Sequence, residues 1–421
     1  MVDRVPDHIA RAVVDPHAFA EWDRLHALLA QLRREHPFAR ADLEGFDPFW
    51  VACKHDDIRE IGRQNEVFPA GIYAIAPRKE LELEYSVGKP SQERVLSSMN
   101  GEEHLKYRLV AQSWFQPKNL RRLEEQFRTI ARRHVNQMAE LGGECEFYSS
   151  VAVHYPLRVI NSILGVSDEH EPFMMRLTQT VTNMDDPDLT GLPAPKTPEE
   201  RSQRSRAISE EASVFFKDLA RARRASPTED VATVIANAQV DGKPIPEAES
   251  LGYFMAVAIA GHDTTSASVS GALWALAERP HQLAKVQANP ELIPNLVDEG
   301  VRWTTPIHHF LRTAARDTEY RGQSISKGDF VLLCYPSGNR DEDVFEDPFE
   351  FKVDRPVNKQ IGFGFGNHVC MGQHLARMEM RIFFEELLPR LKSLELAGTP
   401  TRKISHFLGG PKSVPIRYKM T

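Results

Sequence analysis

Glycines clustered around one cysteine constrain this chain more than any other stretch. Gly362, Gly364 and Gly366 precede Cys370, Gly372 follows it, and the loop ends in the pattern Phe-Gly-x-Gly-x-His-x-Cys-x-Gly. Glycine reaches positive φ and lets the backbone approach a flat ligand closely. Apolar residues then recur at three- and four-residue spacing, which predicts a helix. The cysteine is therefore expected at the start of a helix, where free N–H groups and the helix dipole would stabilise a thiolate.

A cysteine held in this way can act as a nucleophile, a redox thiol or a metal ligand. Glycine and phenylalanine surround the sulfur, whereas a nucleophilic cysteine normally stands on an open cleft. No second cysteine is near it in the sequence, so zinc and iron–sulfur frameworks lack ligands. One thiolate suffices as the axial ligand of haem iron. A lone cysteine is more often a buried structural residue, but the many fixed residue types in the pattern favour a metal ligand.

The loop from Phe363 to Ala376 resembles the haem-binding loop of the cytochrome P-450 superfamily, the haem-thiolate monooxygenases. The resemblance implies that Cys370 is the proximal ligand of haem b, which is iron protoporphyrin IX. It also implies that Phe363 packs against the cysteine, that Gly372 lies in the cofactor-binding loop, and that His368 contacts a haem propionate.

The same resemblance implies a mainly α-helical fold with a smaller β-rich lobe, in one domain over residues 1–421. Haem would lie between the cysteine loop and a long distal helix. The β-rich lobe would contain mostly residues of about 36–75, 305–335 and 395–421. Local patterns predict helices over 19–35, 56–63, 118–165, 170–183 and 199–223, and strands over 49–52, 330–333 and up to Ile416.

A long apolar helix is predicted over 251–276, and its middle carries a polar cluster that starts Ala260-Gly-His-Asp-Thr-Thr. Unpaired polar groups in a buried helix are costly, and Gly261 weakens the helix, so we expect a local widening that holds water or dioxygen. The cluster resembles the superfamily's oxygen-activation motif. That likeness implies that Ala260 lies beside the haem, that Thr264 joins the oxygen-binding network, and that Asp263 delivers protons. A polar kink without chemistry is the alternative.

Two donors for carboxylates are predicted on one helix face. His104 and Arg108 are four residues apart and therefore share a face. A ligand that presents two carboxylates to one face of the protein needs such a pair of donor side chains. The pair resembles the His-x-x-x-Arg element that grips the haem propionates, and Arg312 resembles the superfamily's second propionate arginine.

Glu299 and Arg302 are three residues apart on a predicted helix and can pair. Taken alone, this spacing is common on solvated helices. Together with Arg355 the two residues resemble a structural trio that locks the core beneath the haem.

The predicted substrate pocket combines several loops with the long distal helix. The C-terminal third, through residues 303–312, 335–341 and 409–417, resembles the bacterial α-terpineol hydroxylase group. An apolar lining favours a small hydrophobic substrate such as a monoterpenoid or an alkylbenzene, although a steroid or a fatty acid would also fit. No charged anchor is obvious among the pocket candidates, although His308 could donate one hydrogen bond. The candidates are Ile72, Tyr73, Ile75, Phe173, Leu177, Ala256, Ile259, Ala260, Ile307, His308, Phe407 and Leu408.

The reaction implied by the resemblance inserts one oxygen atom from dioxygen into a C–H bond. No flavin or nicotinamide domain is recognisable in the sequence, so an NAD(P)H-dependent reductase would supply electrons through an iron–sulfur ferredoxin. Five basic residues could steer an acidic ferredoxin, although each could equally belong to a solvated charge run: Lys118, Arg121, Arg122, Arg377 and Arg381. A peroxide-driven enzyme and a haem-based sensor are the competing classes.

Composition adds expectations about location and partners. The net charge of −7 makes nucleic acid an unsuitable partner. The four cysteines form no paired framework, which fits a reducing cytoplasm. The N-terminal residues are charged where a signal peptide is apolar, and the longest apolar stretch, near 251–260, is too short to span a bilayer. We therefore expect a monomeric cytoplasmic protein of the bacterial type, without a membrane anchor.

Overall fold

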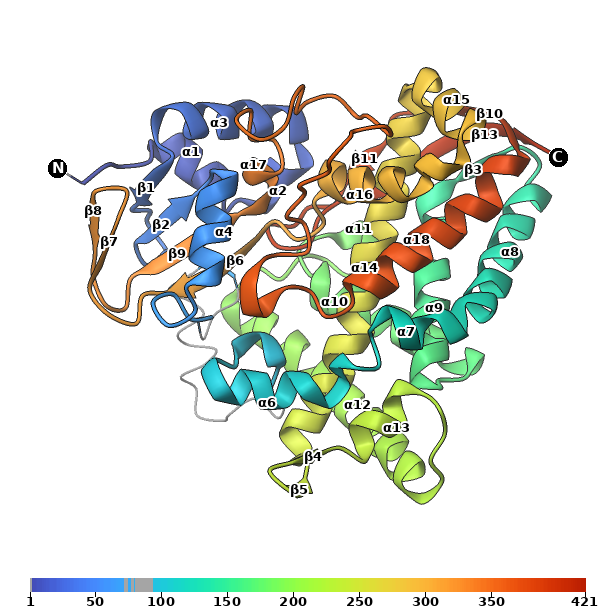
Figure 1. Ribbon diagram of the computed structural model, residues 1–421, viewed down its shortest axis with the longest axis horizontal. Coiled ribbons are helices and arrows are strands. Elements are labelled where there is room, and N and C mark those ends of the chain that lie inside the picture. The colour runs from blue at the N-terminus through green and yellow to red at the C-terminus, as the bar shows by residue number, and fades with distance from the viewer. Residues whose placement is uncertain (1, 72–74, 77–78, 80–93) are drawn as a thin grey trace.

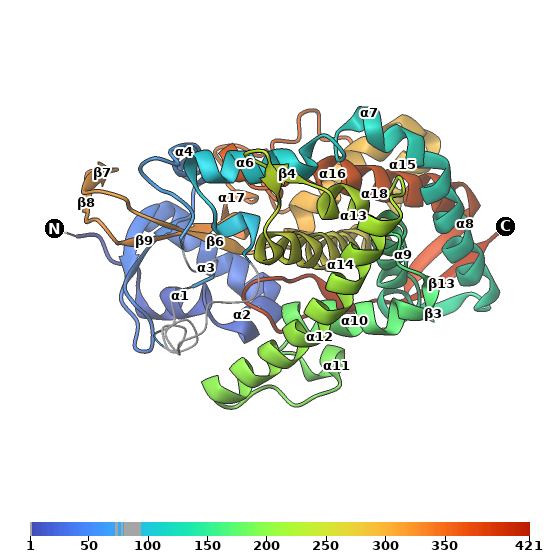
Figure 2. The same cartoon turned by 90° about the horizontal axis from the view of Figure 1, so that it is seen from below.

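The computed structural model describes residues 2–71, 75–76, 79 and 94–421. A large part made of helices lies beside a smaller part that contains a four-stranded sheet, and the long helix α14 (Glu247–Glu278) runs through the helical part (Figures 1 and 2). The predicted fold class, mainly α with a smaller β-rich part, is therefore confirmed.

The described helices occupy the following ranges: α1 (Asp7–Ala12), α2 (Pro16–Ala20), α3 (Trp22–Glu35), α4 (His55–Arg63), α6 (Gly101–Gln112), α7 (Pro117–Leu120), α8 (Glu124–Glu140), α9 (His154–Leu164), α10 (Glu171–Thr182), α11 (Pro187–Thr190), α12 (Pro198–Ala225), α13 (Val231–Ala236), α14, α15 (Pro280–Ala288), α16 (Ile293–Thr304), α17 (Tyr335–Gly338) and α18 (Gln373–Leu387). The described strands are β1 (Phe38–Ala41), β2 (Phe49–Ala52), β3 (Glu144–Glu146), β4 (Gln239–Val240), β5 (Lys243–Pro244), β6 (His309–Thr313), β7 (Thr318–Tyr320), β8 (Gln323–Ile325), β9 (Phe330–Cys334), β10 (Leu391–Leu396), β11 (Thr401–Arg402), β12 (Pro411–Ser413) and β13 (Pro415–Met420).

Helix α14 forms the centre of the helical part. Apolar side chains lie on almost every side of it, and it packs against α9, α10 and α16. A helix that is apolar around its whole circumference is stable only when other elements surround it. This explains why the predicted long helix is also the most enclosed element in Figure 2.

The four-stranded sheet has the order β1-β2-β9-β6, with β2 and β9 parallel and the other pairs antiparallel. Alternate side chains leave its two faces, as strand geometry requires. Phe49 and Leu332 face a cluster with α1, α2 and α3. Trp50 and Leu333 face α4 on the other side. The predicted strand 49–52 and the predicted helices over 19–35 and 56–63 are confirmed in this region, except that a break at Glu21 separates α2 from α3.

The C-terminal strands do not join this sheet. Strand β13 pairs with β10 and β3, and these three strands lie at the opposite end of the molecule (Figure 1). Within the predicted segment 395–421, Leu408 forms a bridge with Ile307 just before β6, whereas β13 belongs to the separate sheet. The predicted end of the last strand at Ile416 is wrong, because β13 continues to Met420. A local sequence pattern identifies a strand but not its pairing partner, and here the partner β3 lies between two distant helices.

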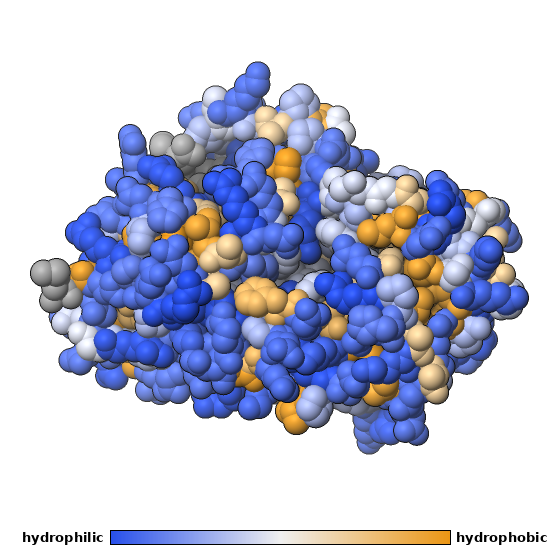
Figure 3. Space-filling model, turned by 90° about the horizontal axis from the view of Figure 1, so that it is seen from above, coloured by the Kyte–Doolittle hydropathy of each residue, from blue (hydrophilic) through white to orange (hydrophobic). Residues whose placement is uncertain are grey.

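Within the described ranges, no helix is long and apolar enough to cross a bilayer. The face shown in Figure 3 is mainly hydrophilic, with apolar side chains in small scattered areas.

Candidate active site

The cysteine loop is held tightly against α4. Gly364 and Gly366 have φ angles of 70° and 74°, which glycine adopts without strain. A Cβ atom on Gly366 would lie only 2.0 Å from the carbonyl oxygen of Gly62, so no other residue fits there. The Cys370 N–H donates to the Phe363 carbonyl at 2.9 Å, and α18 begins at Gln373. The predicted position of the cysteine, just before a helix, is confirmed.

The chemical state of Cys370 depends on more than the helix start. The protein atoms packed around the Cys370 thiol desolvate it and raise its pKa, although part of the residue remains accessible from the site. The Gly372 N–H and the Arg108 guanidinium oppose that rise only in part. The backbone N–H groups at the helix start do favour the thiolate, as expected, but they do not outweigh burial. A bound cation such as haem iron would supply the charge that makes a thiolate favourable there.

One face of α14 is accessible although the helix is otherwise buried. The accessible or half-buried positions include Ala256, Ile259, Ala260 and Thr264, which recur at helical spacing and so form one face. Cys370 is also exposed. The site therefore combines an accessible thiol with one accessible helix face inside a packed core.

Four donors from three segments of the chain converge beside the cysteine. The rings of His104 and His368 have centroids 4.2 Å apart, and Arg108 donates to the Val369 carbonyl at 2.8 Å. Burial, followed by the charges of Arg108 and Arg312, lowers the pKa of His104 to about 4. Burial and the same neighbours lower the pKa of His368 to about 3. The structure thus brings together the four predicted propionate-binding side chains.

Two nitrogen atoms of this donor cluster lack acceptors within the described part of the chain. His104 Nε2 and Arg312 Nε are buried, and neither has a hydrogen-bond partner among the described residues. Buried donors without acceptors are costly. A flat group that carries two carboxylates and an iron atom would satisfy these donors and the Cys370 sulfur together, so the residues fit haem. The fold and this donor set define the class of haem-thiolate proteins.

Asp263 and Thr264 are neighbours in sequence, but their side chains occupy different surroundings. The Thr264 hydroxyl donates to the Ala260 carbonyl at 2.7 Å on the accessible face. Asp263 is fully buried and contacts Lys403 at 3.1 Å. Burial alone would raise the pKa of Asp263, but the ammonium of Lys403 is foremost among the neighbours that hold it well below the usual range.

Helix α14 is continuous from Glu247 to Glu278, so the expected widening near Gly261 does not interrupt it. Gly261 has another role. A Cβ atom at this position would lie 2.2 Å from Cδ1 of Ile160 in α9. The glycine therefore allows α9 and α14 to approach closely.

The predicted structural trio is assembled in the core. Arg302 donates to both carboxylate oxygens of Glu299 at 2.8 Å, and Arg355 donates to the same two oxygens at 3.1 and 3.3 Å. The Lys352 N–H donates to Glu299 as well, at 2.9 Å. Burial opposes ionisation, but the two guanidinium groups lower the pKa of Glu299 to about 2.

The predicted pocket residues fall into three groups: accessible or half-buried residues, residues outside the described part of the chain, and buried residues. Ile75, Ile307 and Phe407 are half-buried, like the accessible positions of α14. Phe173 is also half-buried, but its ring packs against Phe215 of α12, with centroids 4.9 Å apart. Two predicted positions, 72 and 73 (Ile72 and Tyr73), lie outside the described residues.

The remaining pocket candidates present no accessible surface. Leu177 and Leu408 are buried, at 0% and 2% exposure. His308 is stacked on Phe19 of α2, with ring centroids 4.0 Å apart. The prediction that His308 faces the substrate is therefore wrong, because the irregular segment before β6 turns its ring towards the N-terminal helices.

Sequence reasoning missed the partners of Asp263. Thr182 and Asn183, at the end of α10, donate to its carboxylate at 2.6 and 2.5 Å, and the Tyr148 hydroxyl lies at 3.4 Å. These residues and Lys403 come from segments far apart in the sequence, so no local pattern connects them. A buried acidic side chain in α14 was the only signal that such partners were needed.

Comparisons with known proteins agree with this site. The family model described as Cytochrome P-450 matches residues 17–419. The chain is 43% identical to cytochrome P-450-terp of a Pseudomonas species over 98% of both chains. It is 33% identical to linalool 8-monooxygenase of Pseudomonas putida, over 93% of this chain and 95% of that protein. The crystal structure of CYP108D1 from Novosphingobium aromaticivorans has a TM-score of 0.91 and 40% identity, over 100% of both chains.

The chain belongs to the cytochrome P-450 family. It is a monooxygenase that binds iron protoporphyrin IX and acts on a hydrophobic substrate with dioxygen and a redox partner.

Proposed function

We propose that the protein hydroxylates a small hydrophobic molecule, either a monoterpenoid such as α-terpineol or an alkylbenzene such as p-cymene. The observation that carries this proposal is the accessible face of α14, where Ala256, Ile259 and Ala260 are small or apolar. Apolar linings with few polar groups bind compact apolar ligands. The names of two relatives, cytochrome P-450-terp and linalool 8-monooxygenase, support a terpenoid substrate.

The chain's own residues would act in three ways. Cys370 would hold the haem iron, with Phe363 packed beside it. The donors His104, Arg108, Arg312 and His368 would bind and orient the propionates. Haem supplies the activation of dioxygen when it is bound. Thr264 would hold a hydrogen bond to a small polar molecule on the accessible face, and the Asp263 carboxylate would relay protons behind it.

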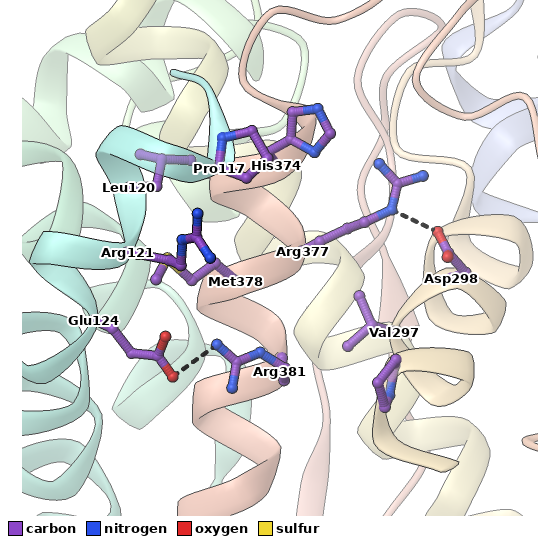
Figure 4. Close-up of a pocket in the computed structure, with 11 residues that line it drawn as sticks. Pro117, Leu120, Arg121, Glu124, Val297, Asp298, His374, Arg377, Met378 and Arg381 are labelled. Atoms are coloured by element: carbon purple, nitrogen blue, oxygen red, sulfur yellow. Dashed lines mark hydrogen bonds and ion pairs between the residues drawn. The ribbon is translucent and has the colours of Figure 1, made fainter. Parts of the chain in front are cut away.

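We propose that an iron–sulfur ferredoxin, reduced by an NAD(P)H-dependent reductase, docks beside α7 and α18. The basic residues there are not equivalent. Arg377 pairs with Asp298 at 2.9 Å and Arg381 pairs with Glu124 at 2.9 Å (Figure 4). Their charge is thus largely neutralised within the protein, which reduces the number of cations available to a partner.

Two exposed cations remain on this surface. Lys118 and Arg121 form no ion pair with any residue in the described ranges. Arg121 also lines a pocket of about 250 Å³ whose floor includes Leu120, Val297 and Met378. We therefore propose that Lys118 and Arg121 carry most of the steering of an acidic ferredoxin. The rate of reduction by ferredoxin would then fall only modestly as salt screens the two charges.

The four cysteines are free thiols. This is consistent with a reducing compartment, and we propose that the protein is cytoplasmic and monomeric. Light scattering on the purified protein would test the monomer directly.

The test of the proposed function is the spectrum of the reduced protein under carbon monoxide, followed by titration with candidate substrates. A strongly red-shifted Soret band is expected from thiolate ligation, and Cys370→Ser is the matched control that should lose it. A spin-state shift with α-terpineol or p-cymene but not with a steroid or a fatty acid supports the small substrate. A shift with only the larger ligands would overturn that part of the proposal. Product that forms with peroxide but not with ferredoxin, reductase and NAD(P)H would identify a peroxide-driven enzyme.

A further inference from the structure

A second pocket lies between α8 and α9, away from the cysteine loop. The two helices pack against each other (Figure 1), and the pocket has a volume of about 210 Å³. Sites for drug-sized ligands begin at roughly 300 Å³, so this pocket suits a molecule of about the size of an amino acid. None of the residues that line it belongs to the candidate active site. The function proposed above therefore leaves this pocket without a role.

The side of the pocket towards the core is formed by an amide without partners. Asn161 of α9 lines the pocket and is only 1% exposed. Its Nδ2 and Oδ1 atoms are buried, and neither has a hydrogen-bond partner among the described residues. Buried polar atoms are costly in this state, and in native structures such atoms normally have a partner. Asn161 thus offers a donor and an acceptor side by side, which a second carboxamide would complement with two hydrogen bonds.

The neighbouring polar residue does not share this property. Ser162 also lines the pocket, but its hydroxyl donates to the Val159 carbonyl at 2.7 Å. His134 of α8 has Nδ1 2.9 Å from the Ile130 carbonyl, and burial lowers its pKa, so the ring is neutral at pH 7. The unmet hydrogen-bonding capacity that the structure describes here is therefore centred on Asn161.

The exposed side of the pocket carries two side chains of opposite charge. Arg133 of α8 and Asp168, in the turn Asp168–His170 between α9 and α10, both line it. Arg133 Nη1 and Asp168 Oδ2 lie 3.7 Å apart, and the two side chains are 57% and 68% exposed. At this distance the pair is loose, because it lacks a hydrogen bond and water screens it. Each group can therefore accept a further charged partner.

A second arginine beside the pocket is already neutralised. Arg158 of α9 pairs with Asp168 Oδ1 and with Glu171 at the start of α10. Together with Arg133, these four side chains carry two positive and two negative charges. A lone anion or a lone cation would upset this balance, whereas a ligand that carries both charges would preserve it.

We propose that the pocket between α8 and α9 binds a small zwitterionic amino acid whose side chain ends in a carboxamide, with glutamine as the probe. The carboxamide of the ligand forms two hydrogen bonds with the Asn161 amide. Its α-carboxylate pairs with Arg133, and its α-ammonium pairs with Asp168. The site is separate from the haem site, so its occupation needs no contact with the substrate.

Titration calorimetry of the haem-loaded wild-type protein with glutamine tests the proposal. The melting temperature is a second readout, since a ligand that binds only the folded state raises it. Leucine lacks the amide and propionamide lacks both charges, so each is expected to bind about tenfold more weakly than glutamine or worse. The Soret band should stay unchanged in all three titrations, because none of these ligands is expected at the haem iron.

Variants assign the binding to named side chains. Asn161→Leu keeps a side chain of similar size without the amide and should weaken glutamine binding by about tenfold or more. Arg133→Gln should weaken it by about three- to tenfold, because exposed charge pairs are weaker. Ser162→Ala is the matched control and should bind glutamine like the wild type, since its hydroxyl is already bonded within α9.

The stability of Asn161→Leu is itself informative. Because the amide lacks partners in the structure, the variant without ligand should melt at or above the wild-type temperature. A variant that melts well below the wild type and a crystal structure grown with glutamine that shows only ordered water at Asn161 would each overturn the proposal, because bound water would then satisfy the amide. If Asn161→Leu does not fold, Arg133→Gln and the comparison of glutamine with leucine and propionamide still decide.

Three results of the titrations also overturn the proposal. The first is glutamine that produces neither heat nor a rise in melting temperature at millimolar concentration. The second is leucine or propionamide that binds as tightly as glutamine. The third is a Soret shift with glutamine, which would place the ligand at the iron. A wild-type protein without the red-shifted carbon monoxide band would contradict the proposed function and would leave the evidence from these binding measurements intact.

Discussion

Glu299 and Asp263 are buried carboxylates on helices that flank the site, and both are paired with cations. Glu299 accepts hydrogen bonds from the guanidinium groups of Arg302, one turn away in α16, and Arg355. Asp263 pairs with one lysine on a hairpin and accepts from the end of α10. Both carboxylates have lowered pKa values.

The difference lies in the elements that provide the partners. Two planar guanidinium groups bind both oxygens of Glu299, and such bidentate pairs fix geometry as well as charge. The Lys403 ammonium is a single point charge on a flexible chain. The network around Glu299 is therefore a rigid lock. The pair of Asp263 and Lys403 instead depends on the position of the hairpin that carries Lys403.

The largest effect is expected from Cys370→Ser, which removes the proposed iron ligand and leaves the contacts of Glu299 and Asp263 in place. Product formation should fall to background, because the serine oxygen does not replace the thiolate as an iron ligand. The free energy of unfolding, measured by chemical denaturation, should show that both carboxylate networks still stabilise the fold. A variant that retains the red-shifted carbon monoxide band would contradict the assignment of Cys370.

Glu299→Gln should lower the free energy of unfolding by about 3–5 kcal/mol, since it leaves two buried guanidinium groups without a countercharge. The matched control is Asp298→Asn at the adjacent position. Asp298 pairs with Arg377 near the surface, where both side chains are about one-third exposed, so the expected loss is below about 1 kcal/mol. Equal losses measured by urea unfolding would remove the distinction between the rigid lock and an ordinary surface pair.

Acid should weaken the Glu299 lock over a defined range. The folded-state pKa of Glu299 is about 2, and an unfolded glutamate titrates near about 4.3. This carboxylate therefore contributes stability above about pH 4.3, and up to about 3 kcal/mol of it is lost as the pH falls towards 2. Unfolding of wild type and Glu299→Gln between pH 3 and 7 should show a shallower acid slope for the variant. Parallel slopes would mean that Glu299 is not held ionised.

Gly261→Ala should have the smallest effect. It tests how closely α9 and α14 pack near Asp263. The new methyl group would clash with Ile160, and overpacking costs about 1–3 kcal/mol. Alanine gains about 1 kcal/mol in helix propensity, so the net loss should stay below about 2 kcal/mol. Adding Ile160→Val, which removes the clashing Cδ1 atom, should restore part of the thermal stability. No recovery would show that Gly261 matters for a reason other than close helix packing.

The local patterns predicted more of the fold than of the pocket. The strand 49–52 is β2, and the apolar run 251–276 lies within α14, because periodicity reports which faces are buried. Pairing partners are set by segments far apart in the chain. This is why local patterns did not reveal that β13 pairs with β3 or that His308 stacks on Phe19.

The cysteine loop, the His104 and Arg108 helix face and the Glu299 spacing are short-range features, and the sequence by itself determined them because each depends on neighbouring backbone positions. Only the tertiary structure decided that Asp263 pairs with Lys403, that His308 stacks on Phe19 and that Arg377 is neutralised by Asp298. A buried charge needs a partner, but the energetic need does not specify which distant residue supplies it. That choice is made when helices and hairpins pack together.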